Sequence, residues 1–284
     1  MGLFDKKYCD VCGEKIGMLG NKKLEDANLC KNCAKKLSPW FSERRHSTLE
    51  EIKGQLAYRE ENLEAVKNFH TTRTLGKYTK VLLDEDAKKF MVTSAKDLVE
   101  ANPDVLDYSM VTGCNLDIDE HSSEIYRKVG DKQESYNPKR YEYSYDFYCI
   151  INVNHPYFDE MKFKLNSSSV HTGEVRPGTT VTTGTANVRT GSSIADAAIN
   201  GVMGAMDAIS GRPGSISTGI TPEYAECVAL GEEIKEALMS ARQASRDEEA
   251  AKNAPKYAVK CPQCGATTVP DDFGRCEYCG GKVQ

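Results

Sequence analysis

The sequence lacks long apolar segments. No stretch of its 284 residues approaches the roughly 20 consecutive apolar residues that cross a bilayer, and the first residues lack the apolar run of a secretory signal. Gly2 follows Met1 as in a myristoylation signal, but Lys6 stands where that signal requires Ser or Thr. We therefore expect a cytoplasmic protein with no transmembrane segment.

Patterns typical of enzymes are also missing. The sequence contains no Gly-rich phosphate loop, no nucleophile elbow and no pair of carboxylates in a catalytic context. Its five histidines are scattered without the spacing of metal ligands. Cys114, Cys149 and Cys227 each occupy an apolar position, where a small core side chain is expected rather than a nucleophile. We expect a protein that is not an enzyme.

Basic residues are slightly fewer than acidic residues. The chain has 37 Lys and Arg residues against 42 Asp and Glu residues, a formal net charge of -5. This balance opposes non-specific binding to nucleic acid or to an anionic membrane unless positive charge is gathered locally. Hydrophobic residues make up 39% of the chain, as in ordinary globular proteins, and the length allows two or three small domains.

Eight of the eleven cysteines form two groups of four. The groups, each made of two CxxC pairs, are Cys9, Cys12, Cys30 and Cys33 near the N-terminus and Cys261, Cys264, Cys276 and Cys279 near the C-terminus. The pairs are separated by 17 residues in the first group and by 11 residues in the second. In a reducing compartment this spacing is typical of metal sites. Because four cysteines fill every position around a structural zinc ion, we predict two structural zinc ions.

Redox activity is the alternative interpretation of a CxxC pair. It would require a thioredoxin-like strand and helix beside the pair, which the sequence does not predict, and it leaves the second pair of each group unexplained. Iron can occupy the same four ligands in vitro. The residues after Cys33 can form a helix, whose N-terminus favours thiolates. We expect a treble-clef-like zinc finger over residues 1–45 and a zinc ribbon over residues 258–284.

The hydrophobic period changes between the two cysteine groups. Thr48 to Asn68 has a helical pattern that begins with a capping box completed by Glu51, so we expect a connecting helix within residues 46–73. Its expected apolar face consists of Leu49, Ile52, Leu56, Leu63 and Val66. From about Lys77 to Leu165 the period is two, as in strands with one buried face, and the first hairpin should turn near Asp84 to Ala87.

The strongest alternation runs from Tyr143 to Val153 and predicts a long strand. Antiparallel strands must avoid open edges, commonly by closing into a barrel or by lying under a helix. Thr221 and Pro222 are suited to begin such a helix. Its apolar stripe would be Cys227, Leu230, Ile234 and Leu238. We expect an antiparallel β-barrel with a closing helix over residues 74–242.

Two segments interrupt this organisation. Residues 166–219 are a low-complexity stretch rich in Ser, Thr and Gly, which cannot bury enough apolar surface to offset ordering entropy, so we expect a mobile insertion. Residues 243–257 are charged and Ala-rich, which suits a helical extension or linker before the ribbon. The fold class expected for the whole chain is α+β multidomain.

The N-terminal sequence resembles a known family. Residues 8–17, which read YCDVCGEKIG, followed by residues 29–39, which read LCKNCAKKLSP, are similar to a bacterial zinc-finger family described only as a domain of unknown function. The resemblance implies zinc on the first four cysteines and no established activity. The strand-rich middle resembles pleckstrin-homology-like barrels, and the C-terminal cysteines resemble short ribbons that usually serve contacts with macromolecules.

These observations favour a non-enzymatic interaction protein, in which two structural zinc modules and a barrel present surfaces to a protein partner. One alternative is a nucleic-acid-binding regulator that uses the zinc ribbons. A stacking and phosphate surface for it would be Lys139, Arg140, Tyr141, Tyr143 and Tyr145. Alternating aromatics are, however, also the pattern of strand packing. A second alternative, recruitment to membrane lipids through the barrel, follows from the fold resemblance alone.

Overall fold

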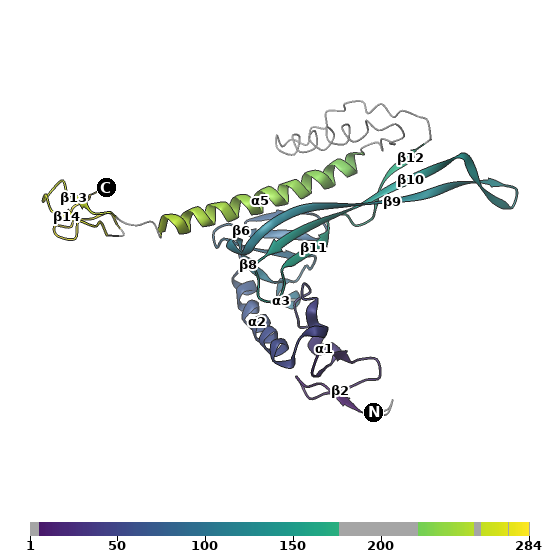
Figure 1. The fold of residues 1–284 in the computed structure, drawn as a ribbon, viewed down its shortest axis with the longest axis horizontal. Helices are drawn as coiled ribbons and strands as arrows, with labels where there is room; N and C mark the ends of the chain where they lie inside the picture. Colours follow the sequence, from purple (N-terminus) through teal and green to yellow (C-terminus); the bar gives the residue numbers. More distant parts are fainter. Residues whose placement is uncertain (1–5, 176–220, 253–256, 272, 284) are drawn as a thin grey trace. The chain divides into compact units, whose positions relative to one another are not determined.

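A computed structural model describes residues 6–175, 221–252, 257–271 and 273–283. The chain divides into two units, residues 1–242 and residues 243–284. The first unit contains one four-cysteine cluster, a helix and antiparallel sheet structure packed against a long helix, and the second contains the other four-cysteine cluster (Figure 1). The α+β class is therefore as predicted. Within the described residues, no helix has both the length and the apolar character needed to span a membrane.

The N-terminal finger consists of two short hairpins and a helical turn. Its elements are β1 (Lys7–Tyr8) paired with β2 (Lys15–Ile16), β3 (Lys22–Lys23) paired with β4 (Asn28–Leu29), α1 (Lys31–Ala34) and the 3-10 helix η1 (Glu43–His46). Its small core contains Leu24, Leu29 and Leu37, joined by Ile52 from the following helix. The finger thus completes its core with a residue from outside its first 45 positions.

Helix α2 (Leu49–Asn68) begins where the sequence predicts. The Thr48 hydroxyl accepts a hydrogen bond from the Glu51 amide, and the Glu51 carboxylate accepts one from the Thr48 amide at 2.7 Å, which completes the capping box. The expected apolar face was only partly right. The buried residues are Ile52, Gln55, Arg59, Asn62 and Val66. The centre of this face is polar because it packs against a polar loop at residues 102–105.

A buried polar network ties α2 to its neighbours on both sides. Arg59 donates to the Asp104 carboxylate at 2.7 Å, and both side chains are buried. Ser38 and Tyr58 donate to the same carboxylate at 2.8 and 3.3 Å, and the Arg59 Nε donates to the Lys36 carbonyl at 3.2 Å. The finger, the helix and the 102–105 loop therefore share one set of buried hydrogen bonds, each satisfying a polar group that has lost water.

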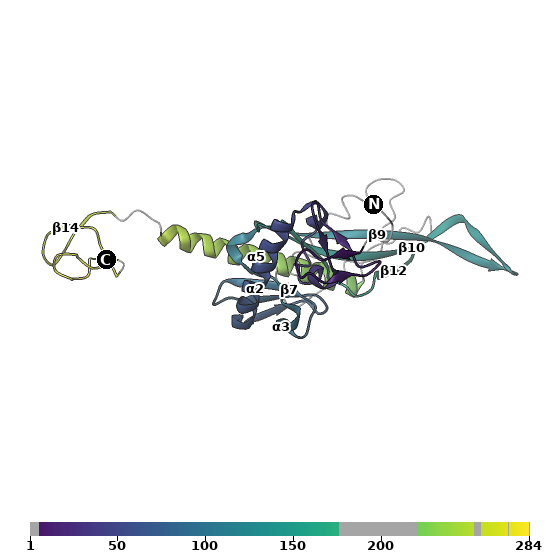
Figure 2. The same ribbon diagram turned by 90° about the horizontal axis from the view of Figure 1, so that it is seen from below.

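The middle of the first unit folds into two antiparallel sheets (Figures 1 and 2). The first is a meander in the order β5 (Arg73–Leu75), β6 (Lys80–Asp84), β7 (Lys89–Thr93) and β8 (Val105–Asp107), with α3 (Leu98–Ala101) between the last two strands. The second pairs β9 (Val111–Val129) with one edge of β10 (Lys132–Val153), whose other edge pairs with β11 (Glu160–Lys164) and then β12 (Val170–Val175). The 3-10 helix η2 (Tyr108–Met110) links the sheets.

The strand register follows the predicted alternation. Leu83 opposes Phe90 across the first hairpin, as expected for a turn after Asp84. On β10, the side chains of Tyr145, Phe147, Cys149, Ile151 and Val153 are buried. Both sheets contribute to one core. Among the described strands, however, no ladder joins the two sheets, so the expected closed barrel is replaced by two packed sheets.

Helix α5 (Pro222–Lys252) lies along one face of the second sheet (Figures 1 and 2). Thr221 accepts a hydrogen bond from the Tyr224 amide, as predicted for a cap. The Tyr224 ring packs edge-on against the rings of Tyr145 and Phe147 at 5.1 and 4.9 Å. Ile234 and Leu238 of the expected stripe are fully buried, whereas Cys227 and Leu230 are only partly buried.

The segment expected as an insertion begins with regular structure. Strand β12 (Val170–Val175) lies inside the range 166–219 and pairs with β10, and the sequence pattern did not predict it. Residues 176–219 lie outside the described residues. At the other end, α5 continues without interruption through residues 243–252, in the stretch for which a helical extension was expected.

Candidate metal centres

The N-terminal cluster brings together all four predicted cysteines. The ligand atoms of Cys9, Cys12, Cys30 and Cys33 lie within 4.8 Å of one another. A tight turn places the first pair, because the Gly13 amide donates to the Cys9 carbonyl at 2.8 Å and Gly13 adopts a φ of +74°. The second pair straddles the start of α1, where the Cys30 sulfur accepts the Cys33 amide at 3.3 Å.

The C-terminal cluster is built from two similar turns. The ligand atoms of Cys261, Cys264, Cys276 and Cys279 also lie within 4.8 Å of one another. The Gly265 and Gly280 amides donate to the carbonyls of Cys261 and Cys276 at 2.9 and 2.8 Å. Strands β13 (Val259–Lys260) and β14 (Thr267–Thr268) form a hairpin that holds the first turn. Both groups found from the sequence are therefore assembled as predicted.

The sulfur spacing fits a tetrahedral metal ion. Four thiolates at about 2.3 Å from a central zinc ion lie about 3.8 Å apart. The Cys12 and Cys30 sulfurs are 3.7 Å apart, and both the Cys261–Cys279 and Cys264–Cys276 pairs are 3.6 Å apart. A disulfide would require about 2.0 Å, and all eleven cysteines, which lie in the described ranges, are reduced. Each cluster is thus able to hold a metal ion in a closed site.

Electrostatics within the clusters favour a bound cation. Burial alone raises the pKa of the Cys9 thiol, but hydrogen bonds from the backbone of Cys12 and Cys30 lower it to about 6. A hydrogen bond from the backbone of Cys264 lowers the pKa of Cys261 to about 6. Burial and contacts with the other sulfurs of its cluster raise the pKa of Cys33. In the N-terminal cluster, Cys9 thus forms a thiolate readily, and a divalent cation would offset the repulsion that opposes a second thiolate at Cys33.

The remaining cysteines do not join a metal group within the described residues. Cys114 and Cys149 are buried on adjacent strands with their sulfurs 3.8 Å apart, and contact with Cys114 together with burial raises the pKa of Cys149. Burial and the neighbouring Glu226 raise the pKa of Cys227 to about 11. A hydrogen bond with Cys149 lowers the pKa of Cys114. The raised pKa values of Cys149 and Cys227 keep these two thiols protonated near neutral pH, which agrees with packing roles.

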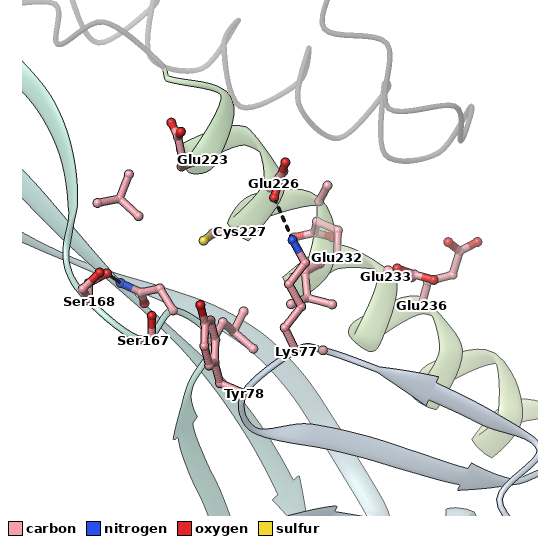
Figure 3. Close-up of a pocket in the computed structure, with 16 residues that line it drawn as sticks. Lys77, Tyr78, Ser167, Ser168, Glu223, Glu226, Cys227, Glu232, Glu233 and Glu236 are labelled. Carbon is pink, nitrogen blue, oxygen red and sulfur yellow. Dashed lines mark hydrogen bonds and ion pairs between the residues drawn. The ribbon is translucent and has the colours of Figure 1, made fainter. Parts of the chain in front are cut away.

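A groove of about 660 Å³ beside α5 was not evident from the sequence (Figure 3). Its walls come from the turn between β5 and β6, the segment after β11, and α5. The acidic side chains that line it are Glu223, Glu226, Glu232, Glu233 and Glu236. Lys77 reaches across from the turn and pairs with Glu226 at 3.2 Å (Figure 3). Because the lining comes from three distant segments, no local sequence pattern could reveal it.

Residues 7–55 match a family described as "Domain of unknown function (DUF4428)". The match contains the whole N-terminal cluster and the first turns of α2. It agrees with the resemblance noted from the residues around Cys9 and Cys30. No curated protein and no solved structure matches the chain.

Proposed function

We propose that this chain is a non-enzymatic adaptor with two structural zinc ions, and that its C-terminal zinc ribbon contacts a protein partner. The donor set supports zinc, because closed sets of four thiolates at this spacing are those of structural zinc sites. Metal binding would contribute much of each module's folding free energy, about 10–16 kcal/mol in small zinc domains. Reduced thiols in both clusters fit a cytoplasmic protein.

Exposed apolar side chains on the ribbon carry the proposal of a protein partner. Phe273 and Tyr278 are 79% and 70% exposed, and Val269 is 46% exposed. Large aromatic side chains are enriched among the residues that dominate binding at protein interfaces. A module held together by metal does not need these side chains in a core of its own, which leaves them available for contact.

The local folds support the expected type of each domain. A hairpin followed by a helix that begins at the second CxxC pair suits a treble clef, and two matched turns suit a zinc ribbon. In the middle of the chain, a four-stranded meander, a second antiparallel sheet and a closing helix occur in the order of pleckstrin-homology-like domains. That likeness rests on element order, so lipid binding at this fold is the weakest of the three functions.

The nucleic-acid alternative loses part of its proposed surface. Tyr145 is buried against Tyr224 and cannot stack on a base in this arrangement. Lys139 pairs with Glu124 at 2.9 Å, and the Arg140 guanidinium lies 4.0 Å from the centre of the Tyr136 ring. These groups already have partners within the chain, which favours the protein partner.

Affinity capture with ribbon variants tests the proposal. The zinc-loaded full chain is immobilised and exposed to extract with and without nuclease treatment, and retained proteins are quantified by mass spectrometry at low and high salt. A Phe273→Ser/Tyr278→Ser variant should lose the specific partner, whereas Tyr126→Ser, which changes a tyrosine on β9 that is 50% exposed, should retain it. Equal capture by all three chains would contradict the proposal. Capture that disappears with nuclease or with salt would favour nucleic acid.

A further inference from the structure

The N-terminal finger carries a basic surface on an acidic protein. Residues 6–47 contain ten Lys and Arg residues and five Asp and Glu residues, a net charge of +5 in a chain whose net charge is -5. All lysines of this segment are exposed. Throughout the described ranges, none of them lies in an ion pair with a carboxylate. A zinc ion with four thiolates would reduce this local charge by about 2 and leave it positive.

Four of these cations surround one cavity. The cavity measures about 430 Å³ and is lined by Lys22, Lys31, Lys35 and Arg44, with no acidic residue in its lining. The Lys23 carbonyl accepts a hydrogen bond from Arg44 at 2.7 Å, which fixes the guanidinium at the rim. Ammonium and guanidinium groups gathered in this way suit an anion with several oxygens, such as a phosphate group.

A tight turn on the same surface exposes two large apolar side chains. Met18 and Leu19 are 94% and 87% exposed, at the centre of a turn that the Gly20 amide closes by donating to the Gly17 carbonyl at 2.8 Å. Turn centres are usually occupied by Gly, Pro, Asn or Asp, so the fold itself does not require apolar residues here. Lys31 lines both the basic cavity and a second cavity beside this turn, which places the two features side by side.

We propose that this surface of the finger binds an anionic phospholipid membrane. Met18 and Leu19 enter the interface between headgroups and acyl chains, and the basic cavity receives the phosphate of a lipid headgroup. A membrane surface has an apolar layer beneath a layer of charged headgroups. The apolar turn can enter the first layer and leave water, while the neighbouring lysines remain at the depth of the lipid phosphates. Nucleic acid would contact the cations but would leave the apolar turn at Met18 and Leu19 in water.

Flotation with lipid vesicles tests this proposal on the zinc-loaded full chain. We expect no binding to vesicles of phosphatidylcholine and clear binding when about 30% phosphatidylglycerol is included, with weakening as salt is raised. Lys22→Ala/Lys35→Ala should weaken binding about 5-fold per lysine removed. Met18→Ala/Leu19→Ala should weaken it about 10-fold or more, with little change in the salt dependence.

Control variants test whether binding depends on this surface or on any exposed cation or apolar side chain of the chain. Lys53→Ala on α2 removes an exposed cation elsewhere, and Val99→Ala on α3 removes an apolar group that is 49% exposed; both changes should leave binding unchanged. Metal content measured on every variant reports whether the finger remains folded. The proposal is overturned if the wild-type chain does not bind anionic vesicles, or if either double variant binds them as tightly as the wild type.

Two further measurements, with inorganic phosphate and with captured protein, distinguish a membrane from these other ligands. Inorganic phosphate is titrated calorimetrically into the wild-type chain and the Met18→Ala/Leu19→Ala variant. If phosphate binds both alike while vesicles do not bind, the cavity is a site for free phosphate and the membrane proposal is wrong. If the turn variant loses a captured protein but keeps vesicle binding, the turn contacts protein and the proposal is equally wrong.

Discussion

Removal of the Asp104 carboxylate should destabilise the first unit strongly. Asp104 is fully buried and accepts hydrogen bonds from Arg59, Ser38 and Tyr58. Asp104→Ala leaves the guanidinium of Arg59 buried without its counter-charge, and breaking a buried ion pair by removing one partner typically costs about 3–5 kcal/mol. That loss is a large fraction of the roughly 5–15 kcal/mol by which a domain is stable.

A double-mutant cycle isolates the ion pair from its surroundings. Replacement of both partners by apolar residues, as in Arg59→Met/Asp104→Leu, removes the unpaired charge that each single change leaves behind. We expect the double variant to be about 1–3 kcal/mol more stable than the sum of the single changes predicts. Recovery should be incomplete, because the Lys36 and Asn102 carbonyls both lose the hydrogen bonds that Arg59 donates.

The single tryptophan of the chain provides the assay. Trp40 belongs to the finger, and its ring meets the Phe163 ring of the second sheet edge-on at 6.4 Å. Its fluorescence during urea unfolding therefore reports the contact that the ion pair supports. A loss below about 1 kcal/mol for Asp104→Ala, or strictly additive changes in the cycle, would refute the reasoning, because a surface pair behaves in that way.

Three further predictions concern metal, core and pH. Wild-type protein should contain two zinc ions by elemental analysis, and Cys30→Ser and Cys276→Ser should each lower the content to one, whereas unchanged content would exclude the assigned ligands. Phe147→Ala should cost about 3–5 kcal/mol in urea unfolding while the C-terminal zinc remains bound, and Asn152→Ala should cost little; the reverse order would show that the buried strand face is misassigned. Burial lowers the pKa of His155 despite the opposing charge of Asp104, so the unfolded chain binds the extra proton first and stability should fall as pH drops through about 6.5. His155→Gln should flatten that part of the profile measured with Trp40, and an unchanged slope would exclude His155 as its source.

Short sequence patterns were sufficient to predict the features that depend on residues close together in the chain. The capping box at Thr48 and Glu51 requires only residues three positions apart, and the β10 alternation requires only that one face of a strand be buried. The two cysteine groups were evident because metal sites constrain ligand spacing within the sequence. Each of these features could be recognised without any knowledge of tertiary contacts.

Features that depend on tertiary partners could not be predicted in the same way. The buried face of α2 includes Gln55, Arg59 and Asn62, which an apolar pattern excludes, because the partners that satisfy the last two lie about forty residues further along the chain. Strand β12 lacks a strong alternation and forms because the free edge of β10 is available to it. The basic cavity and the α5 groove draw their residues from several elements and have no local signature.

The placement of Ile52 in the core of the finger determines where the chain can be divided. A fragment that ends at residue 45 would lack Ile52, which is fully buried among the finger's apolar residues, and would lose the hydrogen bond from Arg59 to the Lys36 carbonyl. A fragment that begins at residue 46 would expose the same surfaces on α2. The finger is therefore unsuited to exchange between proteins as an independent cassette. Fusions or truncations that preserve it need to carry α2 and the loop at Asp104 along with the four cysteines.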